Sequence, residues 1–168
     1  MIACGLAAGG LALEAAPAAA GLHVRDRLTW THTDGTPVAF GRDVRVWCGR
    51  WAPDVPVRSI HVIIGRRSPR WELHAVVADV RRRPVVRLPN SFGFDRPRGA
   101  QLFATEGPLE VNSDQEESTG RIRFLRVGCG RRLRIAFRYS GRVGSELFDG
   151  EPLTVRGSFS AGARSSRP

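Results

Sequence analysis

After residue 21, apolar and polar side chains alternate with a period of two, and no other feature of the sequence constrains the fold as strongly. The clearest case lies between Arg132 and Tyr139, where Leu133, Ile135 and Phe137 share a face with Tyr139 and arginines occupy most of the other face. Alternation over four to eight residues is typical of a half-buried β-strand. We expect further strands, from the same alternation, over 24–30, 43–51, 57–65, 71–79, 121–127 and 153–159.

Turn-forming residues separate these runs. They are Asp34-Gly35, Pro53-Asp54, Gly128-Cys129-Gly130, Ser140-Gly141 and Asp149-Gly150. Roughly eight to ten short strands without helices predict an all-β fold, a single antiparallel β-sandwich or a small β-barrel, over residues 21–161. The shared phase of the strands predicts a core made of Val46, Val62, Ile122, Phe124, Leu133, Ile135, Phe137 and Phe159.

Three segments lack the strand pattern and are predicted to be loops or a tail. Residues 89–99 are rich in Pro and Gly and predict a long loop, and residues 106–120 begin like a strand and become an acidic loop. Residues 162–168 are expected to be a frayed tail.

The first twenty residues differ from the rest of the chain. They are mostly Ala, Gly and Leu, carry Glu14 as their only charge and end in Ala-Pro-Ala-Ala-Ala. This pattern predicts a signal-peptide-like segment over residues 1–20, cleaved after Ala20, whose basic beginning would lie upstream of Met1. The alternatives are a cytosolic Ala-rich helix and, if an apolar segment precedes Cys4, a lipoprotein anchor.

Removal of residues 1–20 would leave two cysteines, Cys48 and Cys129. An even pair in an exported domain predicts a disulfide. Closing a loop of about 80 residues would stabilise the fold by roughly 4 kcal/mol. The alternatives are two unpaired thiols or half of a metal site, although no CxxC or HxxxH spacing completes a zinc site.

Part of the chain resembles secreted bacterial lipocalin-like or β-sandwich domains of unknown function. The resemblance rests on Ser118-Thr119-Gly120-Arg121-Ile122-Arg123-Phe124, on the strand 133–139, on Leu153-Thr154-Val155-Arg156-Gly157-Ser158-Phe159-Ser160 and on the opening Asp34-Gly35-Thr36-Pro37-Val38. It covers about a third of the chain. It implies an exported β-domain and carries over no catalytic or binding residue; the cysteine pair and the abundance of Arg depart from the pattern.

All 26 basic residues are Arg, against 16 acidic residues, which gives a net charge of +10. GC-rich codons account for this usage as much as selection does. Without Glu14 the charge is 26 − 15 = +11, and such a charge favours contact with acidic surfaces. The candidate polyanion-binding residues are Arg81, Arg82, Arg83, Arg132, Arg134 and Arg138.

Given export, anionic envelope polymers or lipid head groups are the partners we expect. A nucleic-acid surface would combine these arginines with Trp51, Trp71 and Tyr139. It is less favoured because of the expected export and because arginine is spread through all the expected strands.

No catalytic or metal site emerges from the sequence. The histidines are His23, His32, His61 and His74; no two of them lie two residues apart and no carboxylate companion is obvious, so structural or surface roles are expected. Ser91 is not in a Gly-x-Ser-x-Gly context, and the acidic run 110–117, the best calcium candidate, lacks the EF-hand spacing.

The sequence thus predicts an exported, non-enzymatic β-domain with a binding or structural role at the cell envelope, without a cofactor. No apolar run of 18 residues predicts a membrane span in the mature chain. An enzyme with an unrecognised pocket and an Arg-rich nucleic-acid-binding module are the alternatives.

Overall fold

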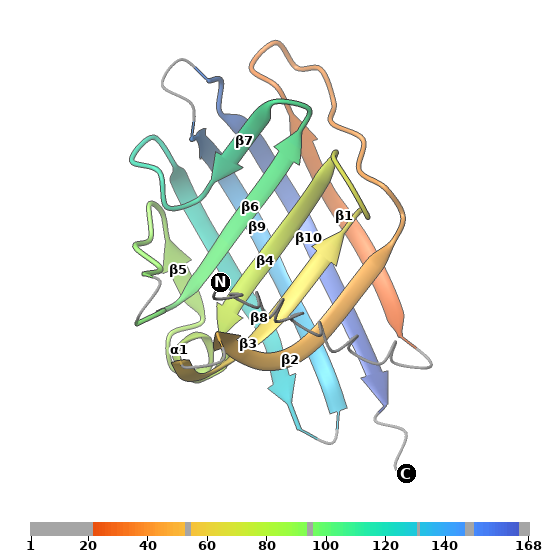
Figure 1. Cartoon of the computed structure of the whole chain (residues 1–168), viewed down its shortest axis with the longest axis vertical. Helices are drawn as coiled ribbons and strands as arrows, with labels where there is room; N and C mark the ends of the chain where they lie inside the picture. Colours follow the sequence, from red (N-terminus) through yellow and green to blue (C-terminus); the bar gives the residue numbers. More distant parts are fainter. Residues whose placement is uncertain (1–21, 53–54, 94–95, 131, 147–149, 165–168) are drawn as a thin grey trace, which may run out of the picture.

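The computed structural model describes residues 22–52, 55–93, 96–130, 132–146 and 150–164. It confirms the all-β prediction: ten antiparallel strands form one sheet that curls into a nearly closed barrel (Figure 1). The strands are β1 (His23–Thr31), β2 (Val44–Ala52), β3 (Val55–Ile64), β4 (Arg70–Val76), β5 (Val85–Arg87), β6 (Ala100–Glu106), β7 (Leu109–Asn112), β8 (Thr119–Cys129), β9 (Arg132–Ser145) and β10 (Leu153–Arg164). The expected segment 1–20, with Cys4, lies outside the described residues.

The barrel has two layers that face each other across the core. The front layer has the strand order β2-β3-β4-β6-β7, and the back layer has the order β1-β10-β9-β8-β5. The layers join where Val111 and Asn112 of β7 pair with Ser145 and Gly144 of β9. Since each strand turns alternate side chains to opposite sides, each layer has one core face and one outer face.

The predicted core lies between the layers. Of the eight residues in the predicted set, seven are buried and Leu133 is half-buried against the core. Trp71 of β4 is fully buried at its centre, with its ring edge-on to those of Phe137 and Phe159 at centroid distances of 6.4 and 5.4 Å. The aromatic side chains of both layers therefore meet in the middle of the barrel.

The predicted disulfide is present in the structure. Cys48 of β2 and Cys129 at the end of β8 are bonded, with their Cα atoms 5.7 Å apart. The bond ties the edge strand of the front layer to the back layer. It links residues 81 positions apart, so it restricts a large part of the unfolded chain.

Thiol titration of the denatured chain, purified from an oxidising compartment without residues 1–20, is expected to find no free thiol. Two free thiols are expected after reduction, from Cys48 and Cys129. Two free thiols before reduction would contradict the bond and would weaken the expectation of export.

Several boundaries differ from the sequence prediction. The expected strand 71–79 ends at Val76, because Val77 and Val80 are buried at helical spacing in the short helix α1 (Val77–Arg82). Ser140-Gly141 is not a turn: a Cβ on Gly141 would lie 2.0 Å from the carbonyl oxygen of Thr119, so the glycine permits close approach of β8 to β9. Gly162 belongs to β10, which pairs with β9 as far as Arg164.

The loop 88–99, which follows β5, connects the two layers. Its Phe92 is 2% exposed and packs edge-on against Trp51 of β2, with ring centroids 4.8 Å apart. Asn90 fixes the return of the loop, since its amide donates hydrogen bonds to the carbonyl oxygens of Arg98 and Ala100. No helix in the described part of the chain is long and apolar enough to cross a membrane.

Candidate functional site

The outer face of the back layer is covered with arginine. The register of β5, β8, β9, β10 and β1 turns eleven exposed arginines to this side. We call this surface the arginine face; its residues are Arg25, Arg27, Arg87, Arg121, Arg123, Arg126, Arg132, Arg134, Arg138, Arg142 and Arg156. The sequence shows the arginines of each strand, but only the strand order unites them on one surface.

No negative charge balances this surface from within its strands. Among the described residues of the five strands, the only acid is Asp26, and it lies in the core-facing phase of β1, opposite Phe159. None of the eleven guanidinium groups lies within 4.0 Å of a described carboxylate. The arginine face is therefore a field of unpaired positive charge.

Two pairs on this face are unfavourable by the rules of sheet stability. Arg123 of β8 lies directly opposite Arg138 of β9, and Arg121 of β8 lies directly opposite Arg87 of β5. Like charges at directly opposite positions destabilise a sheet. Local violations of such rules are expected at functional sites, where they are retained for a reason other than stability.

The structure places the six arginines predicted to bind polyanions in two different regions. Arg132, Arg134 and Arg138 lie on the arginine face, as their shared phase predicts. The three arginines near the end of α1 do not lie on it. Of these, Arg81 donates from Nε to the carbonyl oxygen of Val127, 3.1 Å away.

The other two nominated arginines line a hollow at the edge of the arginine face. Arg82 and Arg83 meet Arg87 and Arg121 of the face and Arg98 of the loop 88–99 around a volume of about 880 Å³. We call this the arginine hollow. Of the described residues that line it, Asp79 is the only acid, and its Oδ2 accepts a hydrogen bond from the backbone N–H of Gly99.

The aromatic residues proposed for nucleic-acid stacking do not reach this surface. Trp71 and Tyr139 are 0% and 2% exposed. Trp51 lies on the front layer, against His61 and Phe92. The sequence-based pairing of these rings with the arginines is therefore wrong. The outer positions of the five back-layer strands hold no aromatic residue within the described ranges. A single-stranded nucleic acid would find charge there but no stacking platform.

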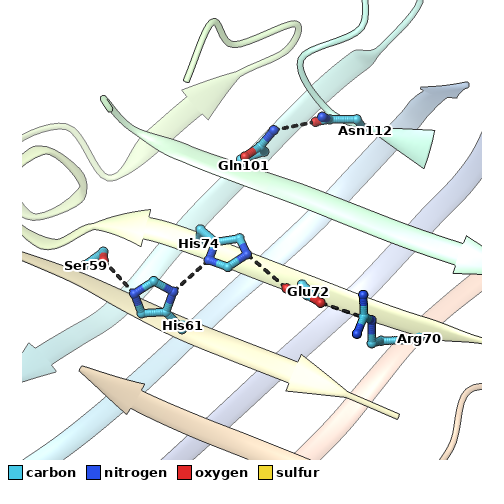
Figure 2. Close-up of polar contacts among 7 residues, drawn as sticks. All are labelled: Ser59, His61, Arg70, Glu72, His74, Gln101 and Asn112. Atoms are coloured by element: carbon cyan, nitrogen blue, oxygen red, sulfur yellow. Dashed lines mark hydrogen bonds and ion pairs between the residues drawn. The ribbon is translucent and has the colours of Figure 1, made fainter. Parts of the chain in front are cut away.

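The outer face of the front layer has a different chemistry. Figure 2 shows a chain of side chains that runs across β3 and β4. Ser59 Oγ lies 2.7 Å from His61 Nε2, and His61 Nδ1 lies 2.7 Å from His74 Nδ1. His74 Nε2 is 3.1 Å from Glu72 Oε2, and the chain ends in an ion pair between Glu72 and Arg70.

No local sequence pattern indicates the pairing of the two histidines, because it depends on strand register. His61 and His74 are thirteen residues apart but directly opposite each other in the β3–β4 ladder. Glu72, two residues before His74 on the same strand, is the carboxylate companion that was not recognised. The period-two pattern alone would have placed Glu72 and His74 on one face.

The hydrogen-bonding capacity of these groups restricts where protons can lie. An ionised Glu72 only accepts hydrogen bonds, so Nε2 of His74 carries a proton. The contact between the two Nδ1 atoms needs one proton, on either ring. All bonds are satisfied with two neutral rings or with one charged ring, but two charged rings would direct two N–H groups at each other.

The surroundings of these groups favour an ionised Glu72 and a neutral His61. Burial raises the pKa of Glu72, but the hydrogen bond from His74 and the charge of Arg70 outweigh it and hold the pKa below its usual value. Burial, and then the charge of His74, lower the pKa of His61 to about 4. Glu72 is thus ionised at neutral pH and His61 is neutral.

Aromatic rings enclose the buried histidine. The ring of His61 is stacked on that of Trp47 at 4.8 Å and is parallel to that of Trp51 at 6.3 Å. Ser59 is 0% exposed, so its hydroxyl is not placed to attack a substrate, although the order Ser–His–His–Glu is reminiscent of a hydrolase relay. The geometry suits a rigid structural network under the loop 88–99.

The acidic run 110–117 contributes to a second polar group on the same face. Asp114 Oδ2 lies 3.2 Å from Gln101 Nε2 and accepts a hydrogen bond from the backbone N–H of Phe92. Gln101 also donates to Asn112, as Figure 2 shows. Burial raises the pKa of Asp114 to about 6. Within the described ranges, no three His, Cys, Asp or Glu residues are arranged to hold a metal ion.

No protein-family model, curated protein or solved structure matches this chain.

Proposed function

We propose that this chain is an exported, non-enzymatic binding domain whose arginine face attaches to anionic polymers or lipid head groups of the cell envelope. One observation carries the proposal: eleven exposed, unpaired arginines share one face of the barrel, and no described acid lies among them. Such a face attracts polyanions over distances of about 8 Å at physiological salt.

Two features support export. The Cys48–Cys129 bond is of the kind that persists in oxidising compartments. The segment that precedes Gly21 has the small, apolar composition of a cleaved leader. Outside the cytoplasm, wall polymers and lipid head groups are the abundant polyanions, which is why they are preferred here over nucleic acid.

The chemistry of arginine favours phosphate and carboxylate groups. A guanidinium group presents a planar fork of donors that pairs with two oxygens at once and stays charged at all relevant pH values. Because the eleven groups lie on strands rather than on mobile loops, the spacing between them is fixed by the sheet. A repeating anionic polymer can therefore contact several of them simultaneously.

The test compares two double variants of equal charge. Arg123→Ala/Arg138→Ala removes two central residues of the arginine face, whereas Arg66→Ala/Arg67→Ala removes two exposed arginines from the turn between β3 and β4. On a polyphosphate resin, we expect the first variant to elute at clearly lower salt than the wild type. The second variant should elute close to the wild type.

Equal weakening by both double variants would show that only net charge matters and would contradict a specific face. Retention that survives high salt and depends on base sequence, measured with DNA in place of polyphosphate, would favour the nucleic-acid alternative, because non-specific phosphate contacts are lost as salt rises.

A further inference from the structure

A second hollow adjoins the arginine hollow and has an apolar lining. It has a volume of about 620 Å³, and the two hollows share Asp79 and Arg98. We call it the apolar hollow; its apolar lining includes Val55, Pro56, Val57, Val76, Val77 and Pro97.

Solvent reaches the part of this lining that β3 contributes, whereas Val76, Val77 and Pro97 are buried. Val55 and Val57 at the start of β3 are only half-buried, and Pro56 between them is exposed. Exposed apolar surface of this kind is costly in water and is often a ligand-binding surface. An anionic polymer would make no use of it.

We propose that the two hollows together bind a single molecule of an anionic lipid. Its phosphate head group lies in the arginine hollow, and its alkyl chain lies along the apolar hollow. This assignment rests on the proposed function and narrows it from polyanions in general to a phosphate-bearing amphiphile.

The linings support the placement of the head group. Arg82, Arg83, Arg87 and Arg121 line only the arginine hollow, whose apolar lining is limited to Val85 and Val86. The apolar hollow also has arginines at its rim, Arg58, Arg81 and Arg96, but most of its lining is apolar. Arg98 lies at the boundary between the two.

Among the described residues, Asp79 is the only acid that lines either hollow, and it already accepts a hydrogen bond from the backbone N–H of Gly99. Within this part of the chain, a phosphate group therefore meets several guanidinium forks and one carboxylate.

The dimensions support the placement of the chain. Both volumes lie in the range of ordinary ligand sites, about 300–1,000 Å³. Each methylene group that leaves water for an apolar surface contributes about a fourfold gain in affinity when it is fully buried. Chain length is therefore the variable that distinguishes a lipid from a polymer.

The experiment is a calorimetric titration of the disulfide-bonded chain with ethyl, butyl and hexyl phosphate, all kept monomeric. We expect the affinity to rise at each step, by at least about tenfold from ethyl to hexyl phosphate, which requires only partial burial of the four added methylenes. Hexyl glucoside, which has the same chain and a neutral head group, should bind far more weakly than hexyl phosphate.

Two variants separate the head group from the chain. Ala78→Asp changes an exposed residue that lines only the apolar hollow, and the first turn of α1 tolerates an acidic side chain. It should abolish the gain with chain length, while Ala39→Asp, an exposed alanine outside both hollows, should preserve it. Arg121→Ala should weaken all three phosphates by a similar factor and leave the chain-length gain intact.

The outcomes distinguish the lipid assignment from the broader proposal. If the alkyl phosphates bind with equal affinity, or if Ala78→Asp keeps the gain, the lipid assignment is wrong and the arginine face remains. The same holds if phosphatidylglycerol vesicles bind but the monomers show no chain-length gain. If neither the alkyl phosphates nor polyphosphate bind, the proposed function itself is wrong.

Discussion

Replacement of Phe137 by alanine is expected to lower the free energy of unfolding by about 3–5 kcal/mol, the usual cost of truncating a buried Phe. Phe137 is 0% exposed and packs between the rings of Phe124 and Phe159, with centroid distances of 6.0 and 5.5 Å. The truncation removes contacts with Trp71 as well. The interior cannot fully close the resulting cavity, because three large rings surround it.

Chemical denaturation of the disulfide-bonded chain measures this loss. Leu125→Ala is the matched control: Leu125 is 50% exposed at the bulge of β8, so its truncation should change stability by no more than about 0.5 kcal/mol. A loss below about 1 kcal/mol for Phe137→Ala would mean that the core face of β9 has been assigned to the wrong side.

The sequence was sufficient for those properties that depend on one strand at a time. Alternation in 132–139 assigned Phe137 to the core and Arg138 to the outside, because the side chains of a strand have a strict period of two. The same reasoning failed at Val76 and Val77, two consecutive buried residues where β4 passes into α1. A short apolar run does not distinguish a strand from a helix.

Properties that depend on several strands were not predictable. Nothing in the sequence of β9 indicates that Arg123 of β8 lies opposite Arg138, or that β1 and β10 extend the same surface. The spread of arginine through the expected strands was an argument against a nucleic-acid surface, but the strand order gathers eleven of the arginines on one face. The histidine pair was hidden for the same reason, since register places His61 opposite His74.

The pairing of Cys48 with Cys129 was predictable because only two cysteines remain after the leader-like segment. The two hollows were not, because they form where α1, β3, β5 and the loop 88–99 meet. Their positions depend on tertiary packing rather than on any local pattern.

Acidification is expected to lower the free energy of unfolding through His61, because this side chain is held neutral in the folded chain. Burial lowers its pKa from 6.5 to about 4. The group therefore contributes stability above pH 6.5 and loses it progressively as the pH falls from 6.5 to 4, by about 3 kcal/mol in total. The other titratable or charged groups in the hydrogen-bonded series of side chains that contains His61 are His74, Glu72 and Arg70.

Protonation of Asp114 has the opposite effect on the free energy of unfolding. Its pKa is raised by burial from 3.8 to about 6, so its protonation favours the folded state as the pH falls from 6 to 3.8. In the wild type the two effects partly cancel over the same range, and its stability should change less than either group alone would dictate. Asp114→Asn removes the favourable term and should make the loss on acidification steeper.

His61→Phe isolates the histidine term. Phenylalanine keeps a flat ring beside Trp47 and Trp51 but cannot be protonated. The variant is expected to be less stable than the wild type at pH 7, because His74 and Ser59 lose a hydrogen-bond partner. As the pH falls to 4, this difference in the free energy of unfolding should shrink by about 3 kcal/mol.

Urea denaturation at a series of pH values measures this difference. The control is His23→Phe, at an exposed position of β1, which should follow the wild type. If the difference in the free energy of unfolding between the wild type and His61→Phe stays constant across this range, the hydrogen-bonded side chains around His61 take up protons freely. Burial then does not hold His61 neutral.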